Sequence, residues 1–268
     1  MTDRIDREAL EAAPRLRVVA CCSVGYDHVD VAAAAERGIR VTNTPGVLTD
    51  ATAELTWALI LAALRRVVPG DRQVREGRWV GWSPLCTYGF ELRGKTLGVV
   101  GAGRIGAAVA RIGALGFGMR VVYAATRAHP ELDAALGAVR RELDDLLEES
   151  DVITLHLPLT ADTRGILGRE RLARMKPGSV LVNTARGALV DEAALAESLR
   201  AGRPAAAGLD VYSREPEVPA ALLPLENVVL LPHLGSATAE TRERMMATAA
   251  RNALAVLRGE VAPNVVGG

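Results

Sequence analysis

The chain has 268 residues, of which 49% are hydrophobic and 24% charged, and its formal net charge is zero. This length is enough to bury a substantial core, in one large domain or two smaller ones. The balanced charge argues against nucleic acid or an anionic membrane as a bulk partner. No apolar run reaches the ~18 residues of a membrane span, and the charged first ten residues are unlike a secretory signal. We therefore expect a cytoplasmic protein.

The cysteines do not point to a metal site or to a disulfide framework. Cys21, Cys22 and Cys86 have neither the spacing of metal ligands nor an even number for pairing. We expect no bound metal.

The first third of the chain alternates short helical and strand patterns before a long helix. We expect a helix over residues 5–13, a strand over 16–20, a loop over 23–28, a helix up to residue 36 and a strand over 39–42. Residues 43–46 read N-T-P-G, a cluster of helix and strand breakers that predicts a hinge. A long helix over residues 49–66 is apolar on most faces, so we expect it to be buried on several sides.

Residues 77–90 hold nearly all the aromatic side chains of their region, without helical or strand periodicity. An irregular, aromatic-rich loop is more often an interface or a lid than a core element.

A glycine-rich turn follows the next apolar run. Thr96–Val100 has the β-branched composition of a buried parallel strand, and it leads into G-A-G-R-I-G at residues 101–106 and a helical pattern over 104–115. Gly101 permits a tight turn, Gly103 lets the backbone approach a pyrophosphate, and Gly106 lets the helix pack closely on the strand. The helix N-terminus offers free N–H groups to phosphates. Strand, turn and helix in this order predict a dinucleotide-binding site.

From residue 94 onward, strand and helix patterns alternate. Further strands are expected over residues 120–123, 151–157, 179–183, 206–211 and 228–231, and helices over 143–149, 191–201 and 239–257. Such alternation predicts an α/β fold with a doubly wound parallel (Rossmann) sheet and right-handed crossovers.

Three polar residues fall at or beside the C-terminal ends of late strands, where open α/β sheets bind ligands. They are Arg186, Glu215 and His233. An arginine can form a bidentate contact with a carboxylate, and a histidine can transfer a proton near neutral pH. A carboxylate beside that histidine would stabilise its charged form. Together they suit reduction of a 2-oxo acid by hydride transfer, although each alone is also typical of an ordinary surface or capping residue.

Through these motifs the chain resembles the D-isomer-specific 2-hydroxyacid dehydrogenases, and within them it is most similar to glyoxylate/hydroxypyruvate reductases. The segments that carry the resemblance span nearly the whole chain. They are residues 23–27 (S-V-G-Y-D), 41–56, 94–106, 154–163 (T-L-H-L-P-L-T-A-D-T), 183–191 (N-T-A-R-G-A-L-V-D), 208–216 and 232–238 (P-H-L-G-S-A-T).

The resemblance implies a role for each matching residue. Arg186 would bind the substrate carboxylate and carbonyl, His233 would donate the proton to the carbonyl oxygen, and Glu215 would pair with His233. The main-chain N–H groups of Val24 and Gly25 would hold the carboxylate, as backbone N–H groups do at many anion sites. The implied cofactor contacts are Gly101, Gly103, Arg104, Ile105, Gly106, Thr126, Arg127, Pro158, Thr163, Thr184, Ala185, Asp210, His233 and Gly235. His156, by contrast, is interpreted as a hydrogen-bonded core residue within its strand.

The residues after the second strand of the cofactor domain favour NADP(H). Enzymes that use NAD usually carry an Asp or Glu there for the ribose hydroxyls. This chain has Thr126 and Arg127 instead, and no acid before Glu131. Both side chains suit a 2′-phosphate, and NAD(H) bound through backbone and water is the alternative.

The resemblance also implies two domains. Residues 43–236 would form the cofactor domain, and residues 1–42 and 237–268 a smaller, flavodoxin-like substrate domain that is split and incomplete. The active site would lie in a cleft that closes at hinges over 43–46 and 232–235. Family members carry several strands and helices before the segment that matches residues 2–6, so we expect Met1 to be an internal start and the chain as given to have little activity. We also expect a homodimer formed through the long helix and the aromatic loop.

Two other functions remain open on the sequence. One is a phosphite or formate dehydrogenase-like enzyme of the same superfamily, which a substrate panel would separate. The other is a non-catalytic NAD(P)-sensing binding protein, which the joint presence of Arg186, Glu215 and His233 disfavours.

Overall fold

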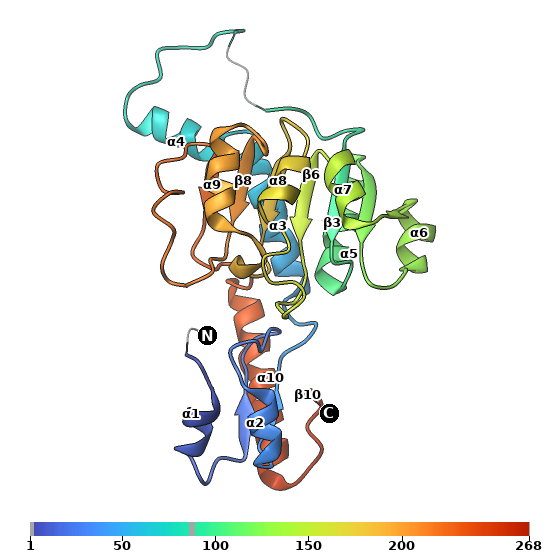
Figure 1. The fold of residues 1–268 in the computed structure, drawn as a ribbon, viewed down its shortest axis with the longest axis vertical. Helices are drawn as coiled ribbons and strands as arrows, with labels where there is room; N and C mark the ends of the chain where they lie inside the picture. Colours follow the sequence, from blue (N-terminus) through green and yellow to red (C-terminus); the bar gives the residue numbers. More distant parts are fainter. Residues whose placement is uncertain (1–2, 86–88, 268) are drawn as a thin grey trace. The chain divides into compact units, whose positions relative to one another are not determined.

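The computed structural model describes residues 3–85 and 89–267 and divides the chain into two compact units (Figure 1). The larger unit is Thr52–Gly235, and the smaller unit joins Met1–Ala51 to Ser236–Gly268. Each unit has its own sheet.

The larger unit is built on a seven-stranded sheet, in which every neighbouring pair of strands is parallel. The strands are β5 (Val139–Arg140), β4 (Arg120–Ala124), β3 (Thr96–Val100), β6 (Val152–Leu155), β7 (Val180–Asn183), β8 (Ala206–Leu209) and β9 (Val228–Leu230), in that spatial order. The order runs outward in both directions from β3 and β6, which confirms the doubly wound α/β fold expected from the sequence.

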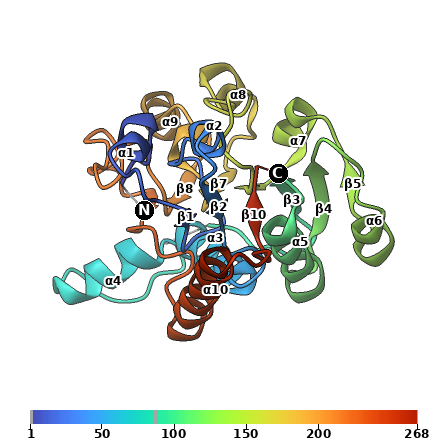
Figure 2. The same cartoon turned by 90° about the horizontal axis from the view of Figure 1, so that it is seen from below.

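Helices cover both faces of this sheet, as the view in Figure 2 shows. They are α3 (Thr49–Leu64), α5 (Arg104–Arg111) with a following π-turn (Ile112–Gly116), α6 (Pro130–Leu136), α7 (Leu143–Glu149), α8 (Arg169–Arg174) and α9 (Glu192–Arg200). Side chains of α7, α8 and α9 form one buried cluster with alternate strand residues such as Ile153 and Leu181. Side chains of α3 and α5 form the other with Leu97 and Val182. Burial on both faces explains why the strands read as continuous apolar runs.

The smaller unit holds a three-stranded sheet in the order β1-β2-β10. Its elements are α1 (Arg7–Glu11), β1 (Val18–Ala20), α2 (Val31–Glu36), β2 (Arg40–Thr42), α10 (Ala239–Arg258) and β10 (Val265–Val266). The sequence predicted only the two parallel strands. β10 pairs antiparallel with β2, with Val265 opposite Thr42, so the end of the chain adds a third strand.

The boundary between the units falls nine residues later than the sequence interpretation placed it, because residues 43–51 group with the smaller unit. Backbone hydrogen bonds explain the difference. The N–H of Asn43 donates to the carbonyl of Asn264 (3.1 Å), and the N–H of Thr44 donates to the carbonyl of Ser23 (2.8 Å). The N-T-P-G segment is thus held by the smaller unit at its first two residues.

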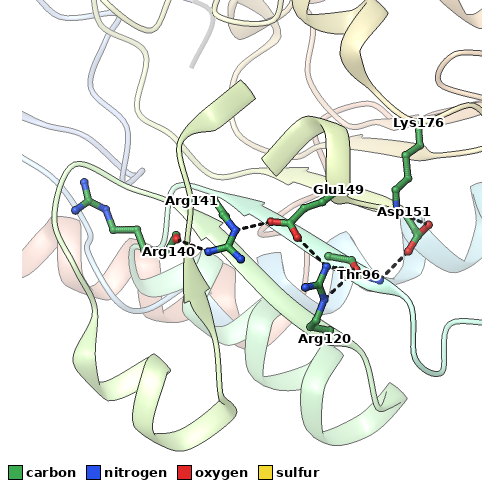
Figure 3. Close-up of polar contacts among 7 residues, drawn as sticks. All are labelled: Thr96, Arg120, Arg140, Arg141, Glu149, Asp151 and Lys176. Carbon is green, nitrogen blue, oxygen red and sulfur yellow. Dashed lines mark hydrogen bonds and ion pairs between the residues drawn. The ribbon is translucent and has the colours of Figure 1, made fainter. Parts of the chain in front are cut away.

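Polar side chains connect the N-terminal ends of several strands of the large sheet (Figure 3). Arg120, at the start of β4, donates to Thr96 Oγ1 (3.1 Å) and to Glu149 (2.7 Å), and Arg141 donates to the same carboxylate (2.8 Å). Asp151 accepts from the N–H of Thr96 (2.8 Å). The contacts of Arg120 and Asp151 satisfy backbone and side-chain groups at the N-terminal ends of β3, β4 and β6, and Arg141, which follows β5, bonds to the same Glu149 carboxylate.

Several short elements were not predicted. They are α4 (Val67–Arg75), α6, α8 and β5, and the helix expected over residues 104–115 changes from α to π geometry after Arg111. The helices α6 and α8 are shorter than two turns, and β5 has two residues. Such short elements have too few positions for a periodic pattern to be recognised. Within the described part of the chain, no helix is both long and apolar enough to span a bilayer.

Candidate active site

The glycine-rich turn between β3 and α5 has the backbone that a dinucleotide site requires. Gly101 has φ +95°, and a Cβ there would lie 2.8 Å from the carbonyl carbon of His156. A Cβ on Gly106 would lie 2.0 Å from the carbonyl oxygen of Gly101. A Cβ on Gly103 would meet nothing within 4 Å, so this side of the turn is open. The first and third glycines are therefore required by packing, and the second leaves room for a ligand to approach the N-terminus of α5.

The predicted site residues of the larger unit all follow C-terminal ends of its parallel strands. They are Gly101, Gly103, Arg104, Ile105 and Gly106 after β3; Thr126 and Arg127 after β4; Pro158 and Thr163 after β6; Thr184, Ala185 and Arg186 after β7; Asp210 and Glu215 after β8; and His233 and Gly235 after β9. Because parallel strands end at the same edge, one edge of the sheet carries the whole set.

Arg186 lies in a turn that Asn183 braces. The Asn183 side chain donates to the carbonyl of Arg186 (2.8 Å) and accepts from the N–H of Ala185 (3.0 Å). The next residue, Gly187, packs so tightly that a Cβ would lie 2.0 Å from the carbonyl carbon of Tyr212. This backbone contact brings the Arg186 turn against the segment that leads to Glu215. Sequence reasoning did not assign a role to Asn183 or Gly187, although both lie within the N-T-A-R-G motif.

His233 and Glu215 are hydrogen-bonded to each other at this edge. His233 Nδ1 lies 2.7 Å from Glu215 Oε2, and the other oxygen of Glu215 accepts from the N–H of Tyr212 (3.0 Å). His233 has φ +57°, a left-handed conformation that non-glycine residues seldom adopt. Since Nδ1 faces the carboxylate, Nε2 is the ring nitrogen left for a ligand.

The surroundings of Glu215 favour its charged form. Burial by itself would raise the pKa of Glu215, but the hydrogen bonds from His233 and from the N–H of Tyr212 outweigh it, and the charges of His233 and Arg186 act in the same direction. The pKa of Glu215 is therefore below its ordinary value. The site thus holds a carboxylate that is ionised at neutral pH against the histidine.

Asp210 holds the His233 loop in its unusual conformation. It is fully buried, and its two carboxylate oxygens accept from the N–H groups of Leu234 (2.7 Å) and Gly235 (2.8 Å). Its carbonyl accepts from the N–H of His233 (2.9 Å). Burial raises the pKa of Asp210, although the two N–H groups favour the carboxylate. The sequence interpretation made Asp210 a cofactor contact, and the structure adds this anchoring of the loop.

The remaining residues expected on the nicotinamide side are held by local hydrogen bonds. Thr163 Oγ1 donates to the carbonyl of Pro158 (2.7 Å). Thr184 Oγ1 lies 2.9 Å from Thr56 Oγ1 on α3. Thr56 and Thr184 are buried, so this contact fixes the turn after β7 to the long helix.

The loop after β4 is fixed by residues that the sequence did not single out. Arg140, at the end of β5, donates to the carbonyls of Ala125 (3.1 Å) and Thr126 (3.4 Å). The buried Tyr123 hydroxyl accepts from the N–H of His129 (2.9 Å). Thr126 and Arg127 themselves are exposed between these two anchors. No pattern in the sequence predicts this role of Arg140, because only the pairing of β5 with β4 brings its side chain to the loop after β4.

The interpretation of His156 was wrong on two points. β6 ends at Leu155, so His156 lies in the loop after the strand. Its Nε2 atom is buried without a hydrogen-bond partner among the described residues. Burial lowers the pKa of His156 to about 3, so the ring is neutral at physiological pH.

In the smaller unit, Val24 and Gly25 lie in the loop after β1. The side chain of Asn43 donates to the carbonyl of Val24 (2.8 Å), and Ser23 Oγ donates to the carbonyl of Gly25 (2.6 Å). Within residues 3–85 and 89–267, no group of three or more His, Cys, Asp or Glu side chains is arranged to hold a metal ion.

A doubly wound sheet, a G-x-G-x-x-G turn and a histidine–carboxylate pair at the same edge define a nicotinamide-dependent oxidoreductase. Comparison with known proteins agrees. Residues 57–235 match the family model "D-isomer specific 2-hydroxyacid dehydrogenase, NAD binding domain". The chain is 54% identical over 271 residues to a glyoxylate reductase of Aeropyrum pernix, covering 99% of this chain and 81% of that protein.

Solved structures give the same assignment. A crystal structure of a protein from Thermus thermophilus is 55% identical, with a TM-score of 0.91 over 98% of this chain and 83% of that one. An NADPH-dependent glyoxylate/hydroxypyruvate reductase of Sinorhizobium meliloti, in complex with NADP and malonate, is 39% identical, with a TM-score of 0.91 over 99% and 82%. The chain belongs to the D-isomer-specific 2-hydroxyacid dehydrogenase family, and it is an NAD(P)-dependent enzyme that acts on a small 2-oxo acid.

Proposed function

We propose that this protein reduces glyoxylate or hydroxypyruvate to the 2-hydroxy acid, of D configuration where the product is chiral, with NADPH as the preferred reductant. The observation that carries the proposal is the His233–Glu215 pair, 2.7 Å apart, next to the Arg186 turn. The names of the relatives, glyoxylate reductase and glyoxylate/hydroxypyruvate reductase, support this choice of substrates.

Each residue of the site has a separate role in the proposed reduction. A nicotinamide cofactor, when bound, would supply the hydride that reduces the carbonyl carbon. Arg186 binds the carboxylate and carbonyl oxygen through its planar fork of N–H donors. His233 gives the proton on Nε2 to the carbonyl oxygen as negative charge develops there, and Glu215 holds the ring by Nδ1 and stabilises its charged form before transfer. The N–H groups of Val24 and Gly25 bind the substrate carboxylate.

The geometry of the glycine-rich turn fits the cofactor. Gly103 leaves open space beside the N-terminus of α5, where backbone N–H groups bind phosphates. Arg104, Ile105 and Gly106 supply those N–H groups in the proposal, and Pro158, Thr163, Thr184, Ala185 and Gly235 contact the nicotinamide side.

The preference for NADPH rests on the loop after β4. Thr126 and Arg127 are exposed there, and Arg140 lies beside them. Hydrogen bonds to charged groups are worth about 1.5–3 kcal/mol, so NADPH should be favoured by roughly one to two decades in kcat/KM. Thr126→Asp should erase or reverse the preference, because a carboxylate repels the 2′-phosphate. Equal kcat/KM for NADPH and NADH in the unmutated protein would remove the preference from the proposal.

A spectrophotometric panel tests the substrate. Glyoxylate, hydroxypyruvate, pyruvate and a larger 2-oxo acid are compared with each reduced cofactor, and phosphite and formate with each oxidised one. Highest kcat/KM on glyoxylate or hydroxypyruvate supports the proposal. Turnover of phosphite or formate, or cofactor binding without any turnover, would replace it with one of those functions.

We also propose a homodimer. Apolar side chains of α4 and residues 79–85 are exposed, among them Val80 (99%), Trp82 (83%) and Leu85 (88%). Large apolar side chains gathered on one segment are typical of an interface. We propose further that the smaller unit is the substrate domain. We also propose a cytoplasmic location.

A further inference from the structure

Three asparagines form a largely buried hydrogen-bond network in the smaller unit, through side-chain and backbone groups. Asn43 follows β2, Asn252 lies in the middle of α10, and Asn264 comes directly before β10. Asn252 is fully buried, and Asn43 is 9% exposed. A buried amide is costly unless its donors and acceptor are bonded. The burial of amide groups from three separate segments therefore requires a structural or functional explanation.

The three residues bond to one another in a closed ring. Asn264 Nδ2 donates to Asn252 Oδ1 (3.2 Å), and Asn252 Nδ2 donates to the carbonyl of Asn43 (2.9 Å). The N–H of Asn43 donates back to the carbonyl of Asn264 (3.1 Å). Asn252 of the last helix thus holds the carbonyl of Asn43, and Asn264 of the C-terminal segment holds its N–H.

The network ends on the loop that carries Val24 and Gly25. Asn43 Nδ2 donates to the carbonyl of Val24 (2.8 Å), and the N–H of the next residue, Thr44, donates to the carbonyl of Ser23 (2.8 Å). Each of these carbonyls shares a peptide group with the N–H of the following residue. In a planar trans peptide the C=O and N–H point in opposite directions. Holding the two carbonyls therefore aims the N–H groups of Val24 and Gly25 away from Asn43.

Those two N–H groups are available to a ligand. Neither donates a hydrogen bond to any group in the part of the chain that the structure describes. A hydrogen bond accepted by a peptide carbonyl also polarises its N–H, which strengthens that donor toward an anion. The geometry thus provides two fixed, polarised donors side by side.

We propose that Asn43, Asn252 and Asn264 are positioning residues for the substrate carboxylate, acting through the peptide groups of Val24 and Gly25. This inference rests on the proposed function in one respect, which is that these N–H groups bind the carboxylate. It assigns a role in substrate affinity to the last helix and the C-terminal segment, which contain none of the residues proposed to touch the substrate.

Asn264 offers the sharpest test, because its side chain reaches the loop only through Asn252 and then Asn43. We would compare Asn264→Ala and Asn43→Ala with Val265→Ala, a control that trims the neighbouring residue of β10 and leaves the network intact. The readouts are the KM for the 2-oxo acid, the inhibition constant of oxamate as an unreactive carboxylate analogue, the affinity for NADPH, and the amide ¹⁵N–¹H resonance of Gly25.

Both asparagine variants should raise the KM and the oxamate inhibition constant together by roughly tenfold, because binding of the carboxylate is lost equally in ground and transition states. NADPH affinity should not change. The Gly25 resonance should move in Asn264→Ala and stay in Val265→Ala. Adding Asn264→Ala to Asn43→Ala should have little further effect, since both act through one path.

The outcomes separate this inference from the proposed function. If Asn264→Ala leaves the Gly25 resonance and oxamate affinity unchanged, or if Val265→Ala alters them equally, the inference is overturned whatever the enzyme reduces. If the unmutated protein reduces no 2-oxo acid, the proposed function fails, while the Gly25 resonance still decides whether the network holds the loop.

Discussion

At the scale of single residues, the active-site chemistry depends on how each charged group is surrounded. Glu215 accepts hydrogen bonds from both His233 and the backbone of Tyr212. Its carboxylate is stabilised in the folded protein in spite of its burial, and its pKa lies below the ordinary value of 4.5. Asp210 is affected in the opposite direction, because burial dominates and raises its pKa. Two carboxylates on one strand end thus have distinct roles, pairing with the histidine and anchoring the loop.

The lowered pKa of Glu215 gives a pH dependence of stability with a definite sign. A carboxyl whose pKa falls on folding stabilises the native state above its unfolded pKa, and that stability is lost as the pH falls through the folded pKa. Glu215→Gln should therefore cost most stability near neutral pH, and the difference from the unmutated protein should shrink below about pH 4.5. Urea unfolding across pH measures this. Glu217→Gln, at an exposed carboxylate, is the control, and a pH-independent difference would contradict the expectation.

At the scale of elements, the geometry of the site depends on the close contact between the backbones of two loops. Arg186 lies in the turn after β7, and Glu215 lies in the segment after β8. Gly187 lets these two backbones meet, since a Cβ would lie within 2.0 Å of Tyr212 and 2.3 Å of Ser213. No flexible side chain is available to move aside at this contact, so the backbone itself would have to shift.

Gly187→Ala should therefore separate Arg186 from Glu215. We expect a fall in kcat/KM of at least about tenfold, and a loss of about 1–3 kcal/mol in the free energy of unfolding, as for other overpacked sites. Steady-state kinetics and urea unfolding measure the two effects. Gly116→Ala is a matched control, because its Cβ would meet only Ile112 Cγ2 at 4.0 Å. Unchanged kinetics in Gly187→Ala would show that the contact does not position Arg186.

At the scale of the whole molecule, the exposed apolar surface of residues 79–85 predicts association. Replacing Val80 and Trp82 together with serine should convert the proposed dimer to a monomer, because it removes two of the most exposed apolar side chains. Light scattering coupled to size-exclusion chromatography gives the mass directly. Val261→Ser, at a residue 92% exposed elsewhere in the chain, should leave the mass unchanged. An unmutated protein that is monomeric at micromolar concentration would refute the dimer.

The sequence by itself was enough for the fold class and for the position of three polar residues at the ends of the late strands. Thr96–Val100 followed by G-A-G-R-I-G predicts strand, turn and helix from local rules alone, and the structure has all three. Arg186, Glu215 and His233 could be placed at strand ends because parallel strands bring their C-terminal ends to one edge. Such features depend on periodicity and on residue type, which a linear sequence displays in full.

Other features were decided only by tertiary structure. β10 forms because residues 265–266 meet β2 more than two hundred residues away, and no pattern in two residues predicts a partner. Arg140 reaches the loop of Thr126 through strand pairing. Asn252 reaches Asn43 through the packing of α10, and Gly187 is required only because Tyr212 lies against it. These roles arise from contacts between distant segments, and such contacts become specific only when the chain is folded.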